Sequence, residues 1–278
     1  MTGSIESRQA LQFWSSTIIT AAAAAAPPCS PPNIHTLQFK PGSESIVGPA
    51  LLQLRQSLPR PPSILIHDLI EGSGLIRQGA LQEVLLVKSL LFPTATTKPV
   101  CLIPSAFTVH VQCIESYELL RQNQVYPDCT AGFSLETLNV LGVRKSRELD
   151  LNNQTKHRPL SAPHETLMVN LMDNMQQQQQ AVDKTTHDEI ARTGIKIPIV
   201  AGGQCHAVAF WFSLQMDQET FLSTGPSAIN LDQGRGGSSY RQGAILVGGG
   251  MMVVKIGDVL NVDVICTLSR GIEIIVNR

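Results

Sequence analysis

A change of pattern near Pro93 constrains the fold more than any other feature. Before it, apolar runs suited to strands alternate with segments of helical spacing, at residues 34–39, 43–58, 63–67 and 79–92. Strand, helix, strand and helix in this order predict a parallel α/β sheet. After it, runs such as DVLNVDVICTL and GIEIIVN alternate partly between apolar and polar residues, which is typical of half-buried antiparallel strands. We therefore expect an α/β domain over residues 1–95 and a β-sandwich or β-barrel domain over residues 96–278.

Three segments interrupt the predicted β domain. ESYELLRQNQ and SLETLNVL indicate a helical interruption near residues 115–145. The glutamine run at 176–180 lies in a polar insert expected near residues 172–192, and a second insert is expected near 228–239. Their low complexity favours disorder.

Charge and cysteine content exclude several classes of function. The formal net charge is −1 over 278 residues, so no basic face points to nucleic acid as a partner. The six cysteines are scattered and none forms a CxxC pair, which predicts reduced, mostly buried thiols in a cytoplasmic or nuclear protein and no structural zinc. No apolar run is long enough to cross a membrane, and the N-terminus lacks the basic start of a signal peptide.

The stretch ILIHDLIEGSGLIRQGAL, residues 64–81, is the strongest candidate for a site. In open α/β sheets, ligands bind at the carboxyl ends of the strands, and Asp68 follows such a strand. The GSG that follows is no dinucleotide fingerprint, because Arg77 stands where the third glycine should be. Taken alone, Asp68 is equally well explained as a helix or turn cap.

Other sequence templates are absent: there is no GxSxG, HExxH or P-loop. His187 lies in the polar insert and is expected to be solvated. His206 lies in an apolar strand, where a hydrogen-bonded core histidine is a better interpretation than a ligand. Trp211 and Phe212 are expected in the core.

In their order along the chain, these motifs resemble the protein arginine N-methyltransferases, most closely the mono-methylating branch with two tandem modules. The motifs are IES, SES, the 64–81 stretch, LIPSAFTVHVQCIES, GGQCHAVAFWFSLQM, FLSTGP and YRQGAILV. The resemblance implies a partial Rossmann-like, S-adenosylmethionine-dependent methyltransferase domain followed by a β-barrel domain, an α/β plus β fold. It also implies an arginine-containing protein substrate and either a homodimer or pairing with another methyltransferase module.

The resemblance also assigns site residues. Two glutamates of the family grip the substrate guanidinium, and Asp68 and Gln78 stand in their positions. The remaining assignments are substrate contacts at Glu71, Ser239 and Tyr240, the last two in place of a His-Trp pair, and cofactor contacts at Glu6 and Glu44.

Two departures from the family bear on activity. A carboxylate about 4 Å from a unit positive charge contributes roughly 4 kcal/mol at an effective dielectric near 20. Replacing one by the amide of Gln78 would then slow methyl transfer on the order of a thousandfold. The family's glycine-rich cofactor loop should precede IES, but Met1 stands only five residues before Glu6.

Three hypotheses follow. The chain is an impaired enzyme or a fragment of one, or it is a catalytically inactive module that interacts with or regulates a partner. The third is a ligand-binding sandwich with a small α/β appendage, outside the methyltransferases.

Overall fold

The computed structural model describes residues 52, 56, 64–91, 101–123, 125, 146–152, 156–171, 188–226, 240–247 and 252–277. The strand predicted at 34–39, most of the helix predicted at 43–58 and the SLETLNVL helix lie outside these residues, as do Cys29, Cys129 and His187.

A parallel strand pair with a helix between its strands in the sequence forms the α/β part. Strand β1 (Ile64–Ile66) pairs in parallel with β2 (Cys101–Ile103), and α3 (Ala80–Leu91) connects them. Helix α3 carries Glu83 in its first turn and Lys88 in its last, charges that complement the helix dipole. The predictions of a strand near 63–67 and a helix near 79–92 are therefore confirmed. Strand β1 does lie in a parallel pair, but its partner β2 follows residue 95, in the segment that the sequence assigned to the β domain.

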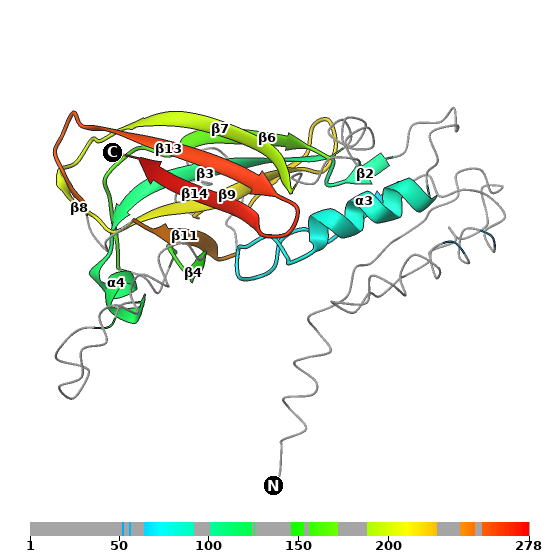
Figure 1. The fold of residues 1–278 in the computed structure, drawn as a ribbon, viewed down its shortest axis with the longest axis horizontal. Helices are drawn as coiled ribbons and strands as arrows, with labels where there is room; N and C mark the ends of the chain where they lie inside the picture. The colour runs from blue at the N-terminus through cyan, green and yellow to red at the C-terminus, as the bar shows by residue number, and fades with distance from the viewer. Residues whose placement is uncertain are drawn as a thin grey trace, which may run out of the picture.

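The larger part of the structure is antiparallel β-sheet (Figure 1). A seven-stranded sheet runs in the order β4-β11-β9-β3-β5, with β6 also on β3 and β10 also on β9; a three-stranded sheet runs β14-β13-β7, and β12 pairs with β8. The bounds are β3 Ala106–Glu115, β4 Arg147–Leu149, β5 Arg158–Pro159, β6 His164–Asn170, β7 Glu189–Pro198, β8 Gly203–Cys205, β9 Ala207–Gln215, β10 Phe221–Ser223, β11 Gln242–Leu246, β12 Met252–Val254, β13 Val259–Thr267 and β14 Gly271–Asn277.

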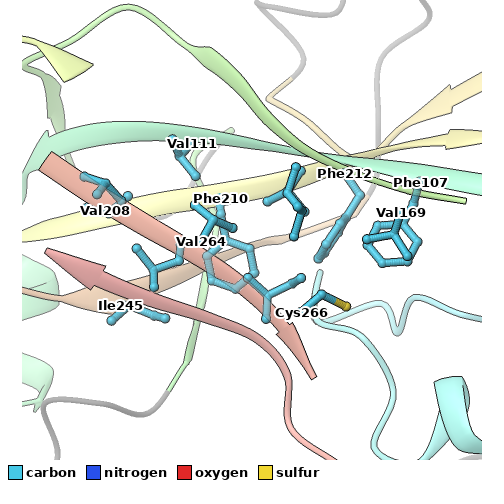
Figure 2. Close-up of a cluster of buried hydrophobic side chains, with 14 of the residues drawn as sticks. Phe107, Val111, Val169, Val208, Phe210, Phe212, Ile245, Val264 and Cys266 are labelled. Atoms are coloured by element: carbon cyan, nitrogen blue, oxygen red, sulfur yellow. The ribbon is translucent and has the colours of Figure 1, made fainter. Parts of the chain in front are cut away.

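The main core lies between the two larger sheets. Alternate residues of β3 and β9 point toward β13, and Figure 2 shows Phe210 and Phe212 beside Val264 and Cys266. Phe107 and Phe212 meet edge to face with ring centroids 5.9 Å apart. Each such side chain contributes about 2–3 kcal/mol when it leaves water, so the facing sheets stabilise one another.

A second core covers the opposite face of the seven-stranded sheet. Ala207 and Ala209 of β9 pack there with Leu149 and with Leu119 of α4 (Tyr117–Asn123). Strand β9 is consequently buried on both faces over eight residues, which explains why AVAFWFSL is apolar at every position except Ser213 instead of alternating. Trp211 and Phe212 are 2% and 0% exposed, which confirms their expected place in the core.

The structure bears on several expectations for the β domain. Helix α4 confirms the first half of the helical interruption. Strand β7 begins at Glu189, so the polar insert ends before residue 189 and does not reach residue 192 as expected. The described strands form open sheets, and their closure into the expected barrel stays a prediction. Of the described cysteines, Cys101 is exposed, whereas Cys113, Cys205 and Cys266 are buried free thiols.

Candidate functional site

The loop between β1 and α3 is a compact hairpin-like turn held by its own backbone. Ile70 and Ile76 form an antiparallel bridge, and the amide of Arg77 donates a 3.0 Å hydrogen bond to the Leu69 carbonyl. Gly74 adopts a φ of 77°, a left-handed conformation that glycine adopts without steric cost. The sequence thus builds a fixed turn at the carboxyl end of β1.

This turn is docked on the β domain at two places. The Arg241 amide donates a 3.2 Å hydrogen bond to the Gly72 carbonyl, and a Cβ added at Gly74 would lie 1.8 Å from the Arg241 carbonyl oxygen. The turn of the β13–β14 hairpin lies beside the same loop, where a Cβ at Gly271 would lie 3.2 Å from that of Ile76 (Figure 1). The structure therefore brings the 71–74 turn together with the segment that begins at Tyr240.

Asp68 and Gln78 lie at the two ends of the loop and are both exposed. Partial burial raises the pKa of the Asp68 carboxyl, while the nearby Arg77 charge acts in the opposite direction. Glu71 is half-buried and accepts a 3.2 Å hydrogen bond from Ser73 Oγ. That Asp68 and Gln78 face one common ligand stays a prediction.

Arg77 is the buried charge of this loop, and sequence reasoning did not identify it as a site residue. Its Nη1 and Nη2 atoms donate to the two carboxylate oxygens of Glu83 at 3.1 and 2.5 Å, with 8% and 19% of the two side chains exposed. Its Nε lies 3.4 Å from the Asp68 carbonyl oxygen and its Nη2 3.5 Å from His67 Nε2. The sequence offers one weak signal for this ion pair: an arginine shortly before a helix that has a glutamate in its first turn.

Tyr240 is half-buried and packs against the main core. The next strand begins with Gln242, which is fully buried: its Oε1 accepts from the Leu151 amide at 3.0 Å, and its Nε2 donates to the Thr224 and Tyr240 carbonyls, both at 2.9 Å. These bonds fix the backbone beside the docked loop. Ser239 lies outside the described residues, and so do the expected cofactor contacts Glu6 and Glu44.

His206 is a hydrogen-bonded core residue, as expected. Its Nδ1 accepts a 3.0 Å hydrogen bond from the Ser116 amide, and its ring meets that of Tyr117 edge to face at 4.6 Å. Burial lowers the pKa of His206, and the Glu115 charge opposes this shift. Within the described ranges, no group of three or more His, Cys, Asp or Glu side chains could hold a metal ion, and no helix is long and apolar enough to cross a membrane.

Comparisons with known proteins support the resemblance. No protein-family model matches the chain. Over 173 residues, 62% of its length, the chain is 31% identical to protein arginine N-methyltransferase 9 of Xenopus laevis, 27% to that of Homo sapiens and 28% to that of Mus musculus. The match spans 19%, 18% and 18% of those proteins, so the chain corresponds to about a fifth of the length of these relatives.

A solved structure shows a similar fold at low identity. It is the Trypanosoma brucei PRMT1 enzyme–prozyme heterotetrameric complex with AdoHcy, with a TM-score of 0.53 and 15% identity over 82% of this chain and 68% of the other. Together with the matches to protein arginine N-methyltransferase 9, this confirms the likeness that the sequence motifs indicated: over part of its length the chain is similar to the protein arginine N-methyltransferases.

Proposed function

We propose that the chain is a module of the protein arginine N-methyltransferase type whose own methyl transfer is impaired, and that it works by pairing with an active methyltransferase module. The proposal includes several properties that the resemblance implies. These are closure of the β-sheets into a barrel, contacts of Glu6 and Glu44 with S-adenosylmethionine, an arginine-containing protein substrate for the pair, and a cytoplasmic or nuclear location.

The charge of the 67–79 loop carries this proposal. A substrate guanidinium needs fixed negative charge to be oriented for attack on a methyl sulfonium. At the position of the second family glutamate this loop has Gln78, an exposed amide. The acid that the fold brings to the loop, Glu83, is already neutralised by Arg77. Asp68 is then the remaining acid of the expected pair, which favours impaired catalysis.

Pairing is supported by the solved structure with the similar fold, which is a complex of an enzyme with a prozyme.

One observation favours a weakly active enzyme as the second candidate. Asp68 is an exposed residue with a partly buried carboxyl group at the carboxyl end of β1, the edge at which α/β proteins bind their ligands. Calorimetric titration of the purified chain with S-adenosylmethionine, followed by assay on an arginine-rich peptide, separates the candidates. Saturable heat together with methylation by the chain alone would establish the weakly active enzyme, whereas neither heat nor methylation would leave the module that works by pairing.

Pairing has a separate test. Light scattering would compare the chain alone with the chain mixed with Xenopus laevis protein arginine N-methyltransferase 9 from which the 173 matched residues have been deleted. We expect a stable complex in the mixture. A chain that stays monomeric both alone and in the mixture would refute a pairing role, whatever the calorimetry shows.

A further inference from the structure

The guanidinium of Arg77 lies among acceptors that match its shape. Glu83 receives two parallel hydrogen bonds, the fork-to-fork geometry in which a carboxylate binds guanidinium most strongly. The Asp68 carbonyl lies on the Nε side, and His67 Nε2 lies near the remaining edge. Contacts on Nε and on both terminal nitrogens fit a guanidinium, whereas an ammonium group has no planar fork to match them.

The electrostatics of His67 fit a cation beside it. Burial, with the Arg77 charge as the second cause, lowers the pKa of His67 to about 3, so the ring is neutral at physiological pH. Arginine has donors only, so Nε2 must be the acceptor and the ring proton sits on Nδ1. His67 Nδ1 is buried and has no hydrogen-bond partner among the described residues. The Arg77 contact thus uses the tautomer that leaves a buried donor unpaired.

The acceptors are positioned by elements other than the Arg77 side chain. His67 continues the parallel pairing of β1, since its amide donates a 2.8 Å hydrogen bond to the Ile103 carbonyl. Glu83 belongs to the first turn of α3, where its amide donates to the Gly79 carbonyl at 2.9 Å. Removing the guanidinium should therefore leave the three acceptors in place, as a preformed site requires.

We propose that His67, the Asp68 carbonyl and Glu83 form a guanidinium-binding site that the chain fills with its own Arg77. An arginine side chain of another protein can then enter only when Arg77 leaves. This second statement rests on the proposed function, since it takes the loop to be a former arginine-recognising element. Binding of guanidinium to the emptied site does not depend on that function.

Chemical rescue tests the binding site. Arg77→Ala empties it, and methylguanidine is added while thermal unfolding is followed. We expect saturable stabilisation of the variant, by roughly 3 °C at a concentration of about ten times Kd. The wild-type chain, with its site filled, should not respond. Methylammonium is the matched ligand control, and the double variant Arg77→Ala/Glu83→Gln is the matched protein control.

Equal stabilisation by methylguanidine and methylammonium would overturn the proposal, and so would an undiminished response of the double variant. If Arg77→Ala fails to fold, Arg77→Gln fills part of the space and is titrated in the same way. Nitrogen NMR of His67 adds a local readout, since methylguanidine should restore the wild-type tautomer.

Access by another protein's arginine is tested with an arginine-rich peptide and its lysine counterpart. The arginine peptide should bind Arg77→Ala at least about tenfold more tightly than it binds the wild-type chain, a gain that the lysine peptide should not show. If methylguanidine stabilises Arg77→Ala but the arginine peptide binds it no more tightly, another protein's arginine does not enter the site. The site filled by Arg77 would then stand as an internal one only. Neither result depends on the calorimetric and pairing tests above, so the two proposals fail separately.

Discussion

Replacing Gly74 with alanine would place a methyl group where the Arg241 backbone already lies. The added Cβ would be 1.8 Å from the Arg241 carbonyl oxygen, whereas ordinary contact begins at 3.4 Å, so the two segments must separate by about 1.6 Å. That movement breaks the bond from the Arg241 amide to the Gly72 carbonyl, worth about 1 kcal/mol. The φ of 77° costs alanine about 1–2 kcal/mol more. We expect a loss of about 2–3 kcal/mol in the free energy of unfolding.

Two other glycines of the same loop separate the cost of the clash with Arg241 from the cost of the positive φ. Gly79 has the same φ of 77° but no atom within 4 Å of an added Cβ, so its alanine variant measures the conformational cost alone. Gly72 also has open space around it and no positive φ, so its variant should be nearly neutral.

Urea denaturation gives the global stability of each variant, and amide hydrogen exchange at Arg241 reports the docking itself. We expect Gly74→Ala to be the least stable and to expose the Arg241 amide to exchange. A Gly74→Ala variant with the stability and exchange of Gly79→Ala would refute the docking of the loop on the β domain.

Three further predictions follow from buried or exposed polar groups. The pKa of His67 is about 3 in the folded chain and 6.5 in the unfolded chain. Between these two pH values, only the unfolded chain binds a proton at this ring. Stability should therefore fall by about 1.4 kcal/mol per unit as pH drops from 6.5 toward 3. His67→Gln should show a shallower slope in urea titrations at several pH values, and an unchanged slope would contradict the burial. Gln242→Ala leaves the buried Leu151 amide without its acceptor and should lower the free energy of unfolding, measured in urea, by about 2–4 kcal/mol. The control Gln82→Ala changes an exposed residue and should have little effect; equal losses would count against the hydrogen bonds of Gln242. Gln78→Glu should tighten binding of an arginine-rich peptide about fivefold in fluorescence anisotropy, from about 1 kcal/mol of solvent-exposed attraction. Gln82→Glu adds the same charge on α3, and an equal gain there would show that position 78 has no special role.

Local pattern was sufficient for much of the fold. The apolar run ending before Asp68 and the periodic segment after Gly79 predicted β1 and α3 to within a residue or two. The continuous apolar run of β9 predicted a strand with Trp211 and Phe212 in the core. These predictions succeed because burial selects apolar side chains at the period of the element that presents them.

The candidate site was predictable only in part. The sequence placed Asp68 and Gln78 on one loop after a strand, and the structure has them there, both exposed. It gave no reason to select Arg77, which was noted only because it stands where the third glycine of a dinucleotide fingerprint should be. An arginine on a polar loop is usually solvated, and its burial follows from the position of α3, which no local pattern fixes.

By itself the sequence determined the limits of β1 and α3, the antiparallel strands of the β domain, and a likeness to the arginine methyltransferases carried by short motifs. Tertiary structure decided which distant segments meet: the 71–74 turn with Arg241, and His67 with Arg77 and Glu83. The physical reason is that helical and strand propensities act over a few neighbouring residues. Contacts across the molecule depend instead on how whole sheets and helices pack, and on a glycine such as Gly74 that lets two backbones approach.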